Sequence, residues 1–105
     1  MGVGPIPAVQ NLLKNTGLSI SDFDVIESNE AFAAQAIAVN RGLDLDPKVV
    51  NPNGGAIALG HPVGATGTII TLKALYHLEI INGKRALITM CIGGGQGIAL
   101  AIERI

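Results

Sequence analysis

The fold of this chain follows from one segment near its end, Lys84-Arg-Ala-Leu-Ile-Thr-Met-Cys91-Ile-Gly-Gly-Gly-Gln-Gly97-Ile-Ala-Leu-Ala-Ile-Glu-Arg104. The first part, from Lys84 to Ile92, is apolar, as buried strands are. Glycines then turn the chain, and Gly97 to Arg104 returns as a last strand. The sequence therefore predicts a β-hairpin at its end.

The only cysteine, Cys91, stands where this first strand gives way to glycines. A thiol on a glycine turn lies beside backbone N–H groups, and acyl chemistry needs both a sulfur and donors for an oxyanion. Taken alone, the position favours a buried core cysteine, because a free cysteine packs like a small hydrophobic residue. The glycine run argues against that interpretation, since a plain core strand gains nothing by losing its side chains.

The rest of the chain alternates between helical and extended patterns. This order predicts one α/β domain, residues 1–105, with a layered mixed sheet of about four or five strands and helices packed on it. Asn29 is expected to cap the second helix. The expected elements are a helix from Pro5 to Gly17, a strand at Asp24–Glu27, a helix from Asn29 to Gly42, a strand at Val49–Asn51 and a helix over Thr66–Ile81.

A glycine-rich stretch from Asn51 to Gly67 holds the second candidate residue, His61. Five glycines in 17 residues predict a loop whose backbone approaches another segment or a ligand. His61 alone could be a turn residue ahead of Pro62. Histidine is also the side chain best suited to pair with a thiol near neutral pH.

Composition excludes several classes of function. A net charge of −1 gives no electrostatic reason to bind nucleic acid or an anionic membrane surface. No apolar run reaches the roughly 18 residues of a spanning helix. One cysteine and two dispersed histidines fall short of a metal site, and the glycines do not form a phosphate loop. A single cysteine fits a reducing compartment, so we expect a cytoplasmic protein. The mean hydropathy of +0.48 predicts apolar surface that is covered by something outside this chain.

Three separate stretches follow one another along the chain. They are Asn29-Glu-Ala-Phe32, Gly54-Gly-Ala-Ile-Ala-Leu-Gly-His61-Pro62 followed by Gly64 and Gly67, and Cys91-Ile-Gly-Gly-Gly95. Met1-Gly-Val-Gly-Pro-Ile-Pro7 is a fourth. In this order they resemble the C-terminal part of a thiolase, the acyl-CoA acetyltransferase family, and the resemblance runs from Met1 to the last residue.

The resemblance implies a reversible Claisen condensation between two acyl-CoA thioesters through an acyl-enzyme. His61 would activate the nucleophilic cysteine and help to stabilise the enolate oxygen, and Asn29 would hold a water that completes this oxyanion site. Cys91 would be the general acid/base. The Gly93 N–H would donate into a second oxyanion site. A thioester α-proton is weakly acidic and needs a close base together with a stabilised enolate.

The resemblance also implies what this chain lacks. The family's nucleophilic cysteine and its CoA-binding loop domain lie in an N-terminal part, which we expect to be the partner of this chain. Met1 and Phe32 would line the acyl pocket. Coenzyme A would enter as the thioester substrate, with no further cofactor. By itself the chain is expected to be inactive, and the full-length protein is expected to be a homo-oligomer.

Two other functions stay open at this point. Cys91 could itself be the nucleophile, with His61 as its base, in a small acyltransferase or thioesterase. The chain could also be a non-catalytic thiolase-like module that only binds a partner or forms oligomers.

Overall fold

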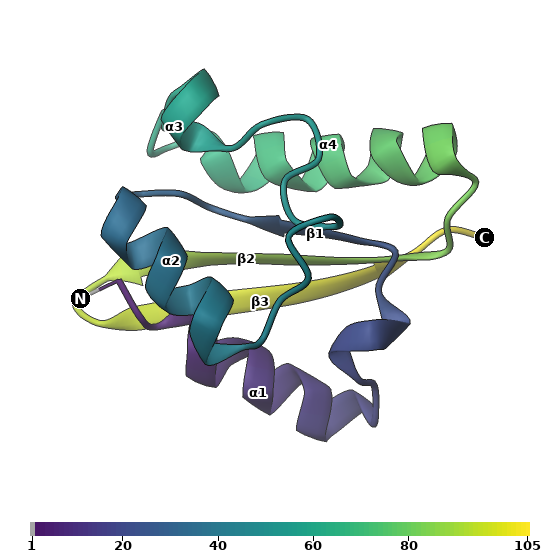
Figure 1. Ribbon diagram of the computed structural model, residues 1–105, viewed down its shortest axis with the longest axis horizontal. Helices are drawn as coiled ribbons and strands as arrows, with labels where there is room; N and C mark the ends of the chain where they lie inside the picture. The colour runs from purple at the N-terminus through teal and green to yellow at the C-terminus, as the bar shows by residue number, and fades with distance from the viewer. Residues whose placement is uncertain (1) are drawn as a thin grey trace.

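The computed structural model describes residues 2–105 and shows helices on both faces of one sheet (Figure 1). Helix α4 covers one face, and α1 and α2 lie on the other. The elements are α1 (Pro5–Thr16), the 3-10 turn η1 (Ile20–Asp22), β1 (Val25–Ser28), α2 (Ala33–Gly42), α3 (Ala56–Leu59), α4 (Thr66–Ile81), β2 (Arg85–Gly93) and β3 (Gln96–Glu103). The predicted α/β class is confirmed.

The sheet has the order β1-β2-β3, with β1 parallel to β2 and β3 antiparallel to it. The predicted terminal hairpin is confirmed, and Cys91 pairs with Gly97 just before its turn. The turn needs glycine, because Gly93, Gly94 and Gly95 have φ angles of 105°, 58° and 80°. The register shifts between Cys91 and Gly93, so the strand bulges beside the thiol.

Two apolar clusters hold the helices to the sheet. Because successive side chains of a strand point to opposite faces, Val25 packs with α4 whereas Ile26 packs with α1 and α2. The same alternation places Glu27 on the α4 side, where it meets Lys73 of α4. Asn29, two residues further on, lies on that side too.

The predicted number of strands is wrong: among residues 2–105 the sheet has three strands, and Val49–Asn51 contributes only a single bridge between Val50 and Ile26. Asn51 explains the difference. Its N–H still donates to the Ile26 carbonyl at 2.8 Å, but its φ of 46° turns the chain that follows away from β1, and its side chain bonds Ser28. Asn51 Oδ1 accepts from the Ser28 N–H at 2.9 Å, and its Nδ2 donates to the Ser28 carbonyl at 2.8 Å.

The prediction that Asn29 caps a helix is also wrong. Helix α2 begins at Ala33, with Phe32 at the capping position. The Asn29 N–H donates to the Thr89 carbonyl at 3.0 Å, so Asn29 continues the pairing of β1 with β2. The predicted bounds of the helix over Thr66–Ile81 are confirmed, whereas the short helix α3 inside the glycine-rich stretch was not predicted.

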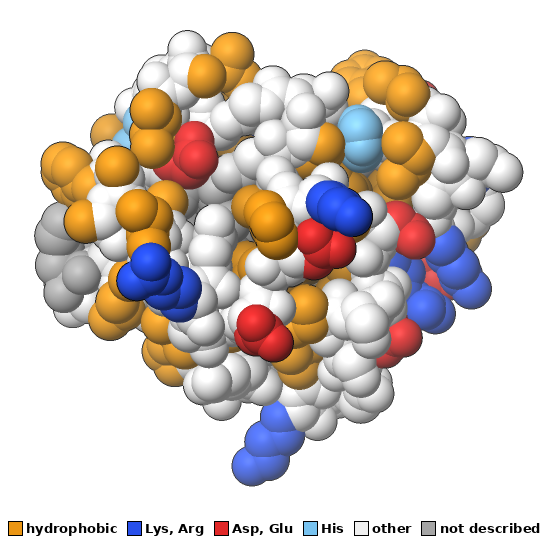
Figure 2. All heavy atoms as spheres, in the orientation of Figure 1, with side chains coloured by type: hydrophobic (Ala, Val, Ile, Leu, Met, Phe, Trp, Pro, Cys, Tyr) orange, Lys and Arg blue, Asp and Glu red, His pale blue; other side chains and the backbone are white. Residues whose placement is uncertain are grey.

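Many large apolar side chains are exposed. They gather over α3 and α4 on the face shown in Figure 2, and others lie on β3. Ile80 of α4 is 76% exposed and Ile98 of β3 is 52% exposed. Among residues 2–105 no helix combines the length and the apolar character that crossing a membrane requires.

Asp24 joins the beginnings of β1 and β2. Its carboxylate accepts hydrogen bonds from the backbone N–H groups of Arg85 at 3.0 Å and Lys84 at 2.6 Å. These donors, that of Arg85 first, hold the pKa of Asp24 below its ordinary value of 3.8. A lowered carboxyl pKa stabilises the fold above that ordinary value, and the stabilisation is lost as the pH falls through the pKa of the folded state.

Replacing Asp24 with alanine is therefore expected to destabilise the chain in a pH-dependent way. At about pH 7 the free energy of unfolding should fall by about 1 kcal/mol, a modest loss because the carboxylate is exposed to solvent. The difference between Asp24→Ala and wild type should shrink as the pH is lowered to about 2.5. Urea unfolding at both pH values measures it. If the difference in unfolding free energy between Asp24→Ala and wild type did not depend on pH, the lowered pKa of Asp24 would be contradicted.

Candidate active site

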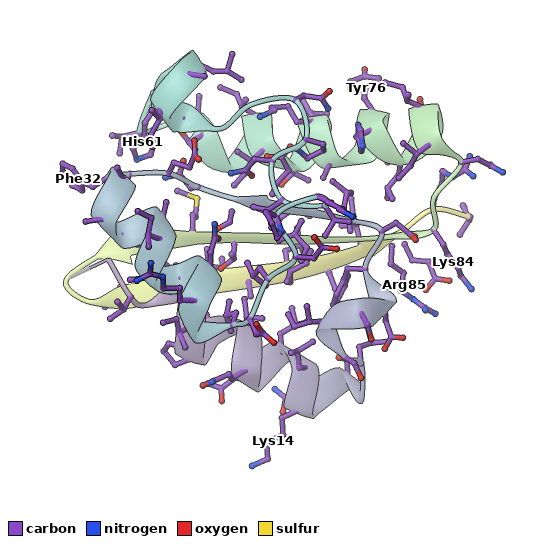
Figure 3. The ribbon with its side chains drawn as sticks, viewed as in Figure 1. Lys14, Phe32, His61, Tyr76, Lys84 and Arg85 are labelled. Carbon is purple, nitrogen blue, oxygen red and sulfur yellow. The ribbon has the colours of Figure 1, made fainter. Side chains whose placement is uncertain are left out.

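The candidate site lies at the end of the sheet where β1 stops and the hairpin turns. Asn29 follows β1 and is held there by its bond to Thr89 of β2, with only 2% of its surface exposed. His61 comes from the loop between α3 and α4. Figure 3 shows His61 and Phe32 at the same end of the molecule, next to the start of α2.

His61 is held by two contacts, one on each ring nitrogen. Its Nδ1 lies 2.6 Å from Thr66 Oγ1, and its Nε2 lies 3.5 Å from Asn29 Nδ2. The loop reaches this place because Gly60 ends α3 with a φ of 96°, a conformation that suits glycine. The structure therefore brings Asn29 and His61 together, as expected from the sequence.

These contacts are compatible with a proton on Nδ1 of His61. The Thr66 hydroxyl lies 3.0 Å from the Pro62 carbonyl, to which it can donate its one hydrogen. In that arrangement Thr66 Oγ1 accepts from His61 Nδ1–H, and Nε2 keeps a free electron pair. The amide Nδ2 of Asn29 can only donate, which agrees with this tautomer. With this tautomer His61 can take up a proton at Nε2.

Thr66 was missed as a site residue in the sequence. It is the first residue of α4 and is buried, 3% exposed. Its position five residues after His61 was the available signal, because a helix start lets a hydroxyl reach the carbonyl four residues back. Without its position relative to His61, a threonine in a stretch of small residues does not indicate a site residue.

Cys91 lies near the end of β2, half-buried and unbridged. Among residues 2–105 its Sγ makes no hydrogen bond, including none to His61 or Asn29. The structure thus separates the predicted residues into a hydrogen-bonded pair, Asn29 with His61, and a thiol beside the Gly93 turn. Within the described part of the chain, residues 2–105, no base is bonded to Cys91.

Glu30 holds the glycine-rich stretch against the site, a role that the sequence did not reveal. Its Oε1 accepts from the Ile57 N–H in the first turn of α3 at 3.2 Å. The same oxygen lies against Gly55, where an added Cβ would overlap with it. Gly55 is therefore required by close approach between the loop and a side chain.

A partly buried ion pair lies under the same loop. Lys73 Nζ of α4 is 3.4 Å from Glu27 Oε2, and it also donates to the Gly54 carbonyl. Burial raises the pKa of Glu27, and the nearby Lys73 ammonium opposes that rise. Lys73 thereby joins β1, α4 and the glycine-rich loop.

Of the two residues expected in an acyl pocket, the structure describes Phe32. Phe32 is 61% exposed at the start of α2, so its ring is available to whatever lies against this end of the sheet. Met1 lies outside the described residues.

A comparison with protein-family models matches residues 1–104 to "Thiolase, C-terminal domain". The chain belongs to the thiolase family. The resemblance noted in the sequence is thereby confirmed, and the segment that matches is the C-terminal domain of thiolases. The match includes the loop that carries His61 and the hairpin that carries Cys91.

Individual thiolases are similar to this chain over its whole length. It is 63% identical to a beta-ketothiolase of Cupriavidus necator over 105 residues, and 55% identical to an acetyl-CoA acetyltransferase of Paracoccus denitrificans over 104 residues. These alignments cover 100% and 99% of the chain but 27% of each relative. The chain thus spans about a quarter of the length of these curated relatives.

Solved thiolase structures share the fold. The crystal structure of human mitochondrial 3-ketoacyl-CoA thiolase in complex with CoA superposes with a TM-score of 0.96 at 53% identity. It matches 99% of this chain and 26% of that one. The arrangement of helices on the sheet is therefore that of a thiolase C-terminal domain.

Replacing Thr66 with valine should release the His61 ring while keeping the shape of the side chain. Losing the hydroxyl leaves His61 Nδ1 without its partner, whereas the Pro62 carbonyl keeps the N–H groups of Ala65 and Thr66, so the free energy of unfolding should fall by about 1 kcal/mol. Nitrogen-15 NMR of the imidazole should show Nδ1–H as the main tautomer in wild type and a mixture in Thr66→Val. Thr66→Ser is the control and should keep the wild-type tautomer. An unchanged tautomer in Thr66→Val would show that the hydroxyl does not set it.

Proposed function

We propose that this chain forms the acid/base half of a thiolase active site, for reversible condensation and thiolysis of acyl-CoA thioesters. The main support is the bonded series Thr66–His61–Asn29, which is compatible with a free electron pair on His61 Nε2. A second cysteine, on the N-terminal part of a complete thiolase, would be the nucleophile. Membership of the family and the TM-score of 0.96 to a CoA complex support this assignment.

His61 would act first as a base and then as a donor. Nε2 takes the proton of the nucleophilic thiol, and the resulting thiolate attacks the acyl carbonyl. In the second half-reaction an N–H at Nε2 donates to the enolate oxygen of acetyl-CoA. A water held by the Asn29 amide donates to the same oxygen. Such prepositioned donors are effective because they need no reorganisation as charge develops.

Cys91 and Gly93 would serve the other side of the reaction. Cys91 gives a proton to the coenzyme A thiolate that leaves, and its own thiolate then takes the α-proton of the incoming thioester. The Gly93 N–H donates to the oxygen of the tetrahedral intermediate. The bulge between Cys91 and Gly93 supports these roles, because it takes this backbone out of regular pairing next to the thiol.

The exposed apolar surface would be the contact with the N-terminal part. Beyond β3 the sheet has no further strand among residues 2–105. A hollow of about 190 Å³ lies between β3 and α4. Since the relatives are almost four times as long as the matched segment, their remaining length is available to cover such a face. The apolar hollow is lined by Gly67, Thr71, Ile88, Met90, Ile98 and Leu100.

The alternative with Cys91 as nucleophile has less support. A nucleophilic thiol is activated by a base within hydrogen-bond reach, and His61 is instead bonded to Thr66 and Asn29. A non-catalytic thiolase-like module would present the same apolar face as the proposed half-site and would differ from it only in lacking activity. Homo-oligomer formation and a cytoplasmic location stay predictions.

A chimera tests the proposed function. The 105 residues replace the matched segment of the Cupriavidus necator beta-ketothiolase, and thiolysis of acetoacetyl-CoA is measured. The chimera should be active. His61→Ala and Cys91→Ala should each lower kcat by about 10²–10⁴-fold, the usual contribution of an acid/base group.

His77→Ala is the matched control, since His77 lies in α4 and bonds only Asn53 among residues 2–105. It should keep kcat close to the value of the unaltered chimera. A folded chimera without activity would favour the binding module. An active Cys91→Ala chimera would refute the acid/base assignment.

A further inference from the structure

A small cavity lies beneath the loop that carries His61, between β1 and α4. The centre of a water-sized sphere can occupy about 20 Å³ of this cavity, which is enough space for one water molecule. Glu27 and Asn29 line it from β1 and its end, and Thr66 and Lys73 line it from α4. The cavity is therefore lined by Asn29, which contacts His61, and by both residues of the Glu27–Lys73 ion pair.

Two buried oxygen atoms at this cavity have no hydrogen-bond partner within residues 2–105. They are Glu27 Oε1 and Asn29 Oδ1, on side chains that are 0% and 2% exposed. Nearly all buried polar atoms of folded proteins are paired, so each of these oxygens requires an explanation. Asn29 follows Glu27 by two residues along the extended chain of β1, so their side chains point to the same face of the sheet.

The protein groups nearby do not supply the missing donors. Lys73 Nζ binds the other carboxylate oxygen of Glu27, Oε2, and the Gly54 carbonyl. The Thr66 hydroxyl gives its single hydrogen to Pro62. Both orphaned atoms are acceptors, and a water molecule has two O–H groups. One water that reaches both oxygens would satisfy both at once.

We propose that Glu27 is a positioning residue for Asn29: a water held in this cavity donates to Glu27 Oε1 and to Asn29 Oδ1, and keeps the Asn29 amide turned with Nδ2 toward His61. The orientation matters because the two ends of an amide have opposite polarity. Turned over, Asn29 would present a carbonyl oxygen to the free electron pair of His61 Nε2, which is repulsive.

The inference rests on the proposed function only for its consequence in catalysis. In a thiolase, Asn29 Nδ2 would hold the water of the enolate oxyanion site. A carboxylate two residues earlier would then determine whether that site contains a donor or an acceptor. The position of the buried water itself is independent of any activity.

A crystal structure of the unaltered chain tests the water directly. We expect an ordered water within about 3.2 Å of both Glu27 Oε1 and Asn29 Oδ1. Two oxygens without this water, or bonded to other groups, would overturn the proposal. Because this measurement needs no variant, it tests the bridging water even if a substitution at Glu27 prevents folding.

Variants then test the orientation of the amide by NMR. In wild type we expect an NOE between the Asn29 side-chain amide protons and the His61 Hε1 proton. Glu27→Met keeps the length of the side chain but removes its acceptor, and the NOE should be lost. Glu27→Gln keeps polar atoms toward both Lys73 and the cavity, and should retain it.

Thr89→Val is the matched control for the loss of a buried polar group. Thr89 is fully buried on the neighbouring strand, bonds the Ile98 carbonyl and does not line the cavity, so the NOE should persist. An NOE that survives in Glu27→Met, or that is lost in Glu27→Gln, would overturn the role of Glu27. None of these readouts needs thiolysis, so a failure here is distinct from a failure of the proposed function.

Discussion

The parallel pairing of β1 with β2 determines where the polar groups of the site can lie. It continues through the bond from the Asn29 N–H to Thr89, one residue beyond β1. Because side chains alternate along a strand, that register turns Glu27 and Asn29 toward α4. The loop before α4 then brings His61 to Asn29. A shift of one residue in β1 would turn both side chains to the opposite face, against α1 and α2, and no site would form.

The site is stabilised by polar groups that each have several partners. Thr66 bonds His61 and Pro62, Lys73 bonds Glu27 and Gly54, and Asn51 bonds both backbone groups of Ser28. A buried ion pair of this kind adds little net stability, since desolvation offsets the attraction, but losing one partner leaves a buried charge. The network therefore contributes geometry more than stability. The apolar clusters on both faces hold the elements themselves.

Patterns local in sequence predicted the fold well, whereas contacts between distant residues were not predictable. The helix over Thr66–Ile81 and the terminal hairpin follow from spacing and glycine positions. The missing strand does not, because Asn51 acts on Ser28, 23 residues away. Asparagine is a residue type that often caps helices, yet the N–H of Asn29 bonds Thr89 of β2 instead. Cys91 and His61 were singled out by the glycines beside them, and the family resemblance implied their roles and that of Asn29. Glu27 acts through Lys73, a partner 46 residues away that only the tertiary structure brings close, whereas Thr66 lies within five residues of His61.

The central claim is that Cys91 is an acid/base thiol and that the nucleophile comes from another part of the enzyme. A direct measurement is the site of acetylation. The chimera with the Cupriavidus necator beta-ketothiolase is mixed with acetyl-CoA, quenched in acid and digested, and the acetylated peptide is identified by mass spectrometry. The account predicts the acetyl group on a cysteine of the region contributed by the relative, with Cys91 unmodified. Acetyl on Cys91 would contradict it.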